Sequence, residues 1–143
     1  MPDRSVRSVI EGQDVLIASV KTTVSDAALL MKRGKVGAII VVEGTRLVGI
    51  FTERDAVFRV LAENRDPHKT KLGDVMTADP RTIAPDRPLG HALHLMFDGG
   101  YRHVPVVEHG RPVGMVSARD ALGPELAAFQ DELVQREHIR EIL

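Results

Sequence analysis

Two short segments of the chain carry a hydroxyl and a carboxylate three residues apart. Their sequences are GIFTERD at 49–55 and GMVSARD at 114–120, and the pairs are Thr52 with Asp55 and Ser117 with Asp120. An ionised aspartate can accept two hydrogen bonds from a vicinal diol such as that of ribose. Free N–H groups at the start of a helix favour a phosphate. The same spacing is also typical of helix capping, so these residues leave both roles open.

Basic residues form a second candidate group. Arg54 and Arg119 lie inside the two segments, and Arg102 and His103 precede an apolar run at 104–107. Paired basic groups near a helix start commonly bind an anion, and the alternative is a solvated entrance to a strand. If His103 binds as a cation, phosphate affinity will fall as the pH rises above its pKa.

These segments belong to a tandem duplication with an offset of 65 positions. Over residues 27–56, 13 of 30 positions are identical to their counterparts at 92–121. Unrelated sequences of ordinary composition would share roughly two. The chain therefore contains the same unit twice.

Each copy is expected to contain a short strand, a helix, a β-hairpin and a second helix. Units of about 60 residues are too small to close a good core alone, so we expect an α+β fold in which two pseudo-symmetric units pack sheet to sheet. The elements expected in the first copy are strands at 15–18, 38–42 and 47–51, a helix from Val24 to Gly34 and a helix from Thr52 to about Ala62. Those expected in the second copy are strands at 82–83, 104–107 and 113–116, a helix at 89–97 and a helix opening at Ser117.

The repeated pattern G-h-h-[ST]-x-x-D, where h is apolar, resembles that of a CBS (cystathionine β-synthase) domain pair, also called a Bateman module. The resemblance covers about residues 8–124 and includes VMT at 75–77, TIAP at 82–85 and YRHVPVV at 101–107. It implies a flat module with two clefts that bind AMP, ADP, ATP, NAD or S-adenosylmethionine. The implied function is that of a non-catalytic regulatory module, with AMP the expected ligand, that signals to an unidentified effector protein in trans.

The resemblance also implies roles for individual residues. Asp55 and Asp120 would hold ribose hydroxyls, Thr52 and Ser117 would contact ribose or phosphate, and Thr82 would border an adenine. The expected nucleotide-binding residues are Ala38, Ile39, Thr52, Arg54, Asp55, Thr82, Arg102, His103, Val104, Pro105, Ser117, Arg119 and Asp120.

The two implied clefts are not equivalent. By the family pattern, Arg102, His103 and Arg119 would face the Asp55 cleft, whereas Gly37, Ala38 and Arg54 would face the Asp120 cleft. A charge-assisted hydrogen bond contributes about 1.5–3 kcal/mol. The sequence therefore predicts tighter binding of a phosphorylated nucleotide in the Asp55 cleft.

Composition argues against several other functions. The net charge is −1, and the aromatic residues are four Phe and one Tyr, so we expect no nucleic-acid binding. No cysteine is present, and no nucleophile–base pair, P-loop or metal cluster supports an enzyme. His91 and His94 have a possible metal-ligand spacing but are expected on the surface, and Met31 and Met96 in the core. An N-terminus without an apolar segment and the lack of long apolar runs predict a cytoplasmic protein with no membrane contact.

The expected boundaries are a first domain at 8–63, a linker at 64–72, a second domain at 73–124 and a C-terminal helix at 125–143. Leu126, Phe129 and Leu133 form an apolar stripe on that helix, which either packs back on the module or contributes to a homodimer. We expect the homodimer. The alternative function is a structural or oligomerisation protein with unoccupied clefts.

Overall fold

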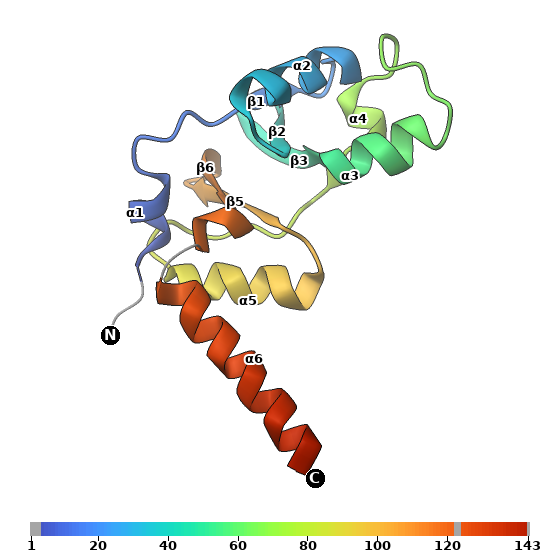
Figure 1. The fold of residues 1–143 in the computed structure, drawn as a ribbon. Helices are drawn as coiled ribbons and strands as arrows, with labels where there is room; N and C mark the ends of the chain where they lie inside the picture. The colour runs from blue at the N-terminus through green and yellow to red at the C-terminus, as the bar shows by residue number, and fades with distance from the viewer. Residues whose placement is uncertain (1–3, 122–123, 143) are drawn as a thin grey trace.

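The protein is an α+β molecule built from two similar halves, as the duplication predicts (Figure 1). The computed structural model describes residues 4–121 and 124–142. The two sheets face each other, with β3 (Arg46–Thr52) in contact with β6 (Arg111–Ser117). The expected sheet-to-sheet packing is therefore present.

The first half contains a four-stranded sheet in the order β1-β2-β3-β4. The strand β1 (Ile17–Ser19) is parallel to β2 (Ala38–Glu43), and β2 forms the expected antiparallel hairpin with β3. The short strand β4 (Thr77–Ala78) pairs with the other edge of β3. Five consecutive residues of β2 are buried, which explains its uninterrupted β-branched and apolar sequence.

The second half repeats the hairpin but has less of a sheet around it. The strand β5 (His103–Glu108) pairs antiparallel with β6. The strand expected at 82–83 is reduced to a single parallel bridge between Ile83 and Val106, in the position that β1 occupies in the first half. The carbonyl of Pro105 accepts from the N–H of Ile83, so the side of Pro105 that lacks an N–H faces this bridge and the β5–β6 ladder is preserved.

The helices α2 (Val24–Gly34) and α5 (Leu89–Gly99) cover the two sheets at equivalent places. The side chain of Thr23 caps α2 by accepting from the N–H of Asp26, as the sequence predicts. Met31 and Met96 are buried in the two cores, which confirms their expected packing role.

The helices that follow the hairpins differ between the halves. In the first half, one turn of α-helix, α3 (Glu53–Asp55), continues as a π-helix, η1 (Ala56–Leu61). In the second half, only a 3-10 turn, η2 (Ala118–Ala121), follows β6. The long helix α6 (Pro124–Ile142) comes next and extends away from both sheets (Figure 1). Up to Ala121, where the described segment ends, the helix expected to open at Ser117 is a 3-10 turn, and the C-terminal helix is present from Pro124 to Ile142.

The core of each half includes a short helix that lies in the chain just before the other half. The helix α1 (Val6–Ile10) precedes the first half in the chain but packs in the core of the second. The helix α4 (Leu72–Val75) lies at the boundary expected for the second domain but packs in the core of the first. The two halves are therefore interlocked, and neither sequence repeat is a separate core.

Phe129 on α6 packs against α5. The ring of Phe129 makes edge-on contacts with His94, at 5.7 Å between centroids, and with Phe97, at 5.3 Å. Further along α6, Val134 is exposed. The predicted stripe residue Leu126 lies outside the residues whose side chains the structure describes.

Candidate functional site

Two cavities lie between the halves, one at each strand–helix junction singled out by the repeat. The first has a volume of about 830 Å³ and contains Thr52 and Asp55, and the second, of about 340 Å³, contains Ser117 and Asp120. Both lie within or near the volume range of small-molecule sites. The sequence pairs therefore occupy equivalent places in two unequal cavities.

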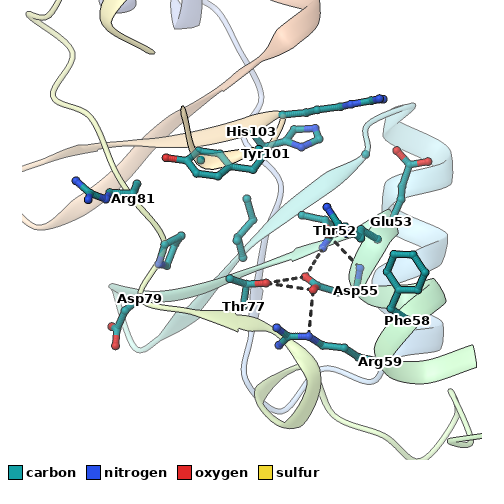
Figure 2. A pocket seen from close by; sticks show the side chains of 17 residues that line it. Thr52, Glu53, Asp55, Phe58, Arg59, Thr77, Asp79, Arg81, Tyr101 and His103 are labelled. Carbon is teal, nitrogen blue, oxygen red and sulfur yellow. Dashed lines mark hydrogen bonds and ion pairs between the residues drawn. The ribbon is translucent and has the colours of Figure 1, made fainter. Parts of the chain in front are cut away.

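Thr52 and Asp55 form a complete capping box at the start of α3 (Figure 2). The hydroxyl of Thr52 accepts from the N–H of Asp55 at 3.2 Å, and the Asp55 carboxylate accepts from the N–H of Thr52 at 3.1 Å. The capping role that the sequence left open is therefore present. Asp55 is only 6% exposed, although it lines the cavity.

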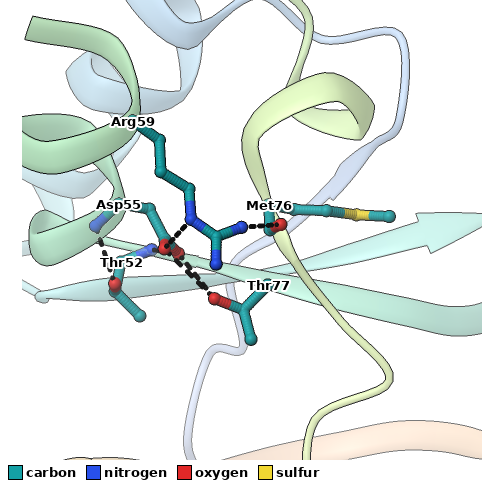
Figure 3. A network of polar contacts seen from close by, with 5 residues as sticks. All are labelled: Thr52, Asp55, Arg59, Met76 and Thr77. Atoms are coloured by element: carbon teal, nitrogen blue, oxygen red, sulfur yellow. Dashed lines mark hydrogen bonds and ion pairs between the residues drawn. The ribbon is translucent and has the colours of Figure 1, made fainter. Parts of the chain in front are cut away.

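The Asp55 carboxylate has two further partners (Figure 3). The Thr77 hydroxyl on β4 donates to it, at 3.1 Å from Oδ1 and 3.2 Å from Oδ2. Nε of Arg59, one turn along the helix, lies 3.5 Å from Oδ1, and its Nη1 donates to the Met76 carbonyl at 2.7 Å. This network joins α3 and η1 to Met76 and to the first residue of β4, Thr77.

The second cavity has a simpler junction. Oδ2 of Asp120 accepts from the Ser117 N–H at 2.7 Å and lies 3.4 Å from the Ser117 hydroxyl. The side chain of Gln13 forms two hydrogen bonds with the backbone of Met115, at 2.8 and 3.0 Å. Met115 is the counterpart of Ile50, which pairs with Thr77 of β4 in the first half. In the second half, the Gln13 amide therefore replaces this pairing between strands.

Gly37 and His103 line both cavities and form a shared wall. A Cβ on residue 37 would overlap the Glu53 carboxylate and approach the His103 ring, so glycine makes room for both groups. Burial lowers the pKa of His103 below its ordinary value. The Glu53 carboxylate opposes this shift, the guanidinium groups of Arg119 and Arg102 add to it, and Asp120 opposes it. His103 is thus disposed to be neutral near pH 7.

The structure distributes the expected nucleotide-binding residues unevenly. Nine of them line a cavity. Those of the first are Thr52, Arg54, Asp55, Arg102 and His103, and those of the second are Ala38, His103, Ser117, Arg119 and Asp120. The remaining four line neither: Ile39, Val104 and Pro105 are buried in the sheets, and Thr82 is exposed.

The expected exchange of arginines between the clefts is wrong. Arg119 was expected in the Asp55 cleft but lines the second cavity, where its Nη2 donates to the Lys35 carbonyl at 3.2 Å. Arg54 was expected in the Asp120 cleft but lines the first cavity, with its guanidinium 5.5 Å from the centroid of the Phe58 ring. Each arginine lines the same cavity as the aspartate that follows it in the chain.

Several cavity residues were not predicted. Arg59, Thr77 and Arg81 line the first cavity, as does Tyr101, whose ring occupies the space where a Cβ on Gly99 would lie. The four-residue spacing of Asp55 and Arg59 on a helix was a readable signal for their ion pair. Thr77 had no comparable signal, because its contact depends on how β4 joins the sheet.

The remaining expectations from the sequence concern the histidines, possible metal ligands and helix lengths. His91 and His94 are exposed on α5, as expected. Within residues 4–121 and 124–142, no three His, Cys, Asp or Glu side chains come together as a metal-binding group. Among the described helices, none combines the length and apolar character needed to cross a bilayer.

Comparison with known proteins places this geometry in a family. The profile of the CBS domain matches the chain twice, over residues 6–62 and 72–123. The CBS domain-containing protein CBSX3, mitochondrial, of Arabidopsis thaliana is 36% identical over 116 residues, which cover 78% of this chain and 56% of that protein. The chain therefore spans little more than half the length of this relative.

Solved structures share the fold. The CBS-domain containing protein ATU1752 from Agrobacterium tumefaciens superposes with a TM-score of 0.76 at 28% identity, covering 83% of this chain and 97% of that one. The CBS domain pair of protein MJ0100 gives a TM-score of 0.74 at 26% identity, covering 83% and 93%. The MJ0100 pair was solved in complex with 5′-methylthioadenosine and S-adenosyl-L-methionine.

Proposed function

The chain belongs to the CBS domain family, and from that membership we propose that it is a regulatory module that senses an adenine nucleotide. AMP, ADP, ATP and NAD are the proposed ligand class, with AMP the first to test. The observation that carries the proposal is the pair of cavities between the halves, each with a hydroxyl, a carboxylate and basic groups at one junction. The MJ0100 pair, solved with 5′-methylthioadenosine and S-adenosyl-L-methionine, supports the adenosyl part of this ligand class.

The side chains divide naturally among the parts of a nucleotide. A carboxylate suits the ribose diol, and the proposed acceptors are Asp55 and Asp120. Guanidinium groups suit phosphate, and those proposed are Arg54 and Arg102 in the first cavity and Arg119 in the second. The Tyr101 ring provides an apolar, planar wall in the first cavity, on the side facing Thr77 and Asp55 (Figure 2).

The proposed output is conformational and non-catalytic. A ligand shifts an equilibrium between two arrangements only by its difference in affinity for them. Because both cavities lie between interlocked halves, occupancy can bias the angle between the halves and so alter a surface that an effector protein reads in trans. The alternative is a structural CBS protein whose clefts stay empty.

A thermal-shift screen with AMP, ADP, ATP, NAD and S-adenosylmethionine tests the proposal. A ligand present at a hundred times its Kd adds about 2.7 kcal/mol to the free energy of unfolding. We expect at least one adenine nucleotide to raise Tm, and guanosine monophosphate, the matched control, to raise it much less. No shift with any adenosyl compound would support the structural alternative.

The proposed assembly is a homodimer in the cytoplasm. Apolar side chains remain exposed on η1, among them Phe58 and Leu61, and on α6 at Val134. Burial of such side chains against a second copy would remove them from water. Light scattering on the full chain and on a chain lacking residues 125–143 measures whether the protein dimerises and whether α6 is required.

A further inference from the structure

Both carboxylate oxygens of Asp55 already face protein donors. A carboxylate offers about four acceptor positions. Oδ2 faces the N–H of Thr52 and the Thr77 hydroxyl, and Oδ1 faces the same hydroxyl and Nε of Arg59. With its side chain 7% exposed and both oxygens engaged by Thr52, Thr77 and Arg59, Asp55 presents no free carboxylate oxygen to a ligand in this arrangement.

Asp120 is in the opposite condition. Its Oδ2 has the Ser117 N–H and hydroxyl as partners, and within the described part of the chain no donor faces Oδ1. The side chain is also more exposed than that of Asp55. Asp120 therefore keeps the acceptor capacity that a diol needs.

The sequence explains why only one aspartate is enclosed. At the offset of 65 positions, the counterpart of Arg59 is Pro124, which has no side-chain donor. Gln13 takes the place of Thr77 beside the second hairpin, and its amide is engaged by the Met115 backbone. Neither residue gives the second carboxylate the contacts that Arg59 and Thr77 give the first.

We propose that Thr77 and Arg59 form a latch on Asp55 that prevents the first cleft from accepting a ribose diol, so that the second cleft is occupied first. This inference rests on the proposed function, since it concerns the order in which the same two clefts bind. It makes Thr77 and Arg59 positioning residues that set affinity through Asp55. The predicted order is the reverse of the one that the basic residues indicated from sequence.

A ribose hydroxyl must replace the Thr77 hydroxyl at Asp55, and for this reason the latch affects diol affinity more than the larger volume of the first cavity does. A ribose hydroxyl that displaces Thr77 makes the same kind of hydrogen bond that Thr77 loses, so the exchange gains little. At Asp120, no described donor faces Oδ1, so a diol hydroxyl displaces water there and leaves no protein hydroxyl without its acceptor. The additional arginines of the first cavity attract phosphate but cannot supply the missing acceptor.

Adenosine is the probe that isolates this effect, because it has the diol and base of AMP but no phosphate. The experiment is calorimetry on the full chain with Asp120→Ala, which leaves the first cleft to be measured alone. Adding Thr77→Val removes the latch hydroxyl at nearly constant volume, and Thr77→Ser retains it. Thr45→Val, in the exposed turn between β2 and β3, is the matched control.

We expect Thr77→Val to tighten adenosine binding to the first cleft at least tenfold, and Thr77→Ser and Thr45→Val to leave it unchanged. Arg59→Gln is the second route to the same end and should also tighten adenosine binding, since adenosine offers no phosphate for Arg59. Circular dichroism identifies any variant that fails to fold. Unchanged or weaker adenosine binding in a folded Thr77→Val or Arg59→Gln variant would overturn the latch.

Failure of the latch and failure of the proposed function give different results. If the unmodified chain binds neither adenosine nor any adenine nucleotide, the proposed function and the latch both fall. Only the latch falls if three results occur together: the unmodified chain binds AMP, Asp120→Ala removes the tighter site, and adding Thr77→Val does not strengthen adenosine binding to the first cleft.

Discussion

The two clefts are built from the same repeated residues, yet their aspartates are in different states. Three donors, on Thr52, Thr77 and Arg59, face the two carboxylate oxygens of Asp55, whereas among the described residues donors face one carboxylate oxygen of Asp120, Oδ2. The repeat itself does not cause the difference, because the hydroxyl and carboxylate recur at the same spacing. The difference comes from the segments that cross between the halves. Two copies of a motif therefore need not offer a ligand two equally accessible carboxylates.

The crossing segments approach the sheets at equivalent glycines. A Cβ on Gly49 would overlap the Met76 side chain, and one on Gly114 would overlap Ile10. After Met76 the chain forms β4 and brings Thr77 to Asp55. After Ile10 it turns at Gly12, and Gln13 substitutes its side-chain amide for a strand. One crossing segment thus encloses its carboxylate and the other does not.

The largest expected effect in folding is that of Gly114→Ala. The new methyl group would lie 2.6 Å from Cγ2 and 2.7 Å from Cβ of Ile10, and a branched Cβ cannot rotate away. Overpacking of this kind costs about 2 kcal/mol. Gly49→Ala should cost less, since the main overlap is with the flexible Met76 side chain. Urea unfolding measures both, and a larger loss for Gly49→Ala would contradict the assigned packing.

Arg119→Gln tests which cleft this arginine serves. Loss of one charge-assisted hydrogen bond to phosphate should weaken AMP binding at the tighter site about tenfold, with adenosine binding little changed. Arg102→Gln is the matched first-cleft variant and should leave the tighter site unaffected. Calorimetry with AMP and adenosine gives the ratio. Equal effects of the two substitutions would mean that the second cavity is not the tighter site.

Removal of the two hydroxyls compares the junctions as helix caps. Thr52→Ala loses a hydrogen bond from the N–H of Asp55 and should cost about 1 kcal/mol in the free energy of unfolding. Ser117→Ala should cost less, because the Ser117 hydroxyl has only a 3.4 Å contact with Asp120. Chemical denaturation of both variants checks this order, and equal losses would indicate that the second junction is also a full capping box.

The smallest expected effect is the pH dependence due to His103. Because its pKa is lowered in the folded protein, the unfolded chain binds the proton more readily. Neutral His103 makes its full contribution to the free energy of unfolding at pH values above its ordinary pKa of 6.5. This contribution decreases as the pH falls through 6.5 towards the lower pKa of the folded protein. Unfolding of the unmodified chain and of His103→Gln at several pH values measures the difference. A relative gain for the unmodified chain on acidification would mean that His103 is cationic between the clefts.

Much of the fold could be predicted from the sequence. The offset of 65 positions located both hairpins, and the capping residue Thr23 and the terminal Gly34 located α2. Apolar residues report that they are buried but not which core they enter. For that reason the sequence did not show that Ile10 belongs to the second core and Val75 to the first.

The site was predictable to a similar degree. The pairs Thr52–Asp55 and Ser117–Asp120 were found because their spacing is local. The placement of Arg54 and Arg119 was wrong because it depends on the relative rotation of two halves, which no local pattern encodes. The contact of Thr77 with Asp55 joins residues 22 positions apart through a two-residue strand, and such a contact is visible only in three dimensions.

The most direct test of the central claim is calorimetry with AMP on Asp55→Ala and Asp120→Ala, each first checked for folding. The enclosed state of Asp55 and the open state of Asp120 predict that Asp120→Ala removes the tighter site, while Asp55→Ala leaves its Kd within about threefold of that of the unmodified chain. A greater loss of AMP affinity in Asp55→Ala than in Asp120→Ala would contradict the account.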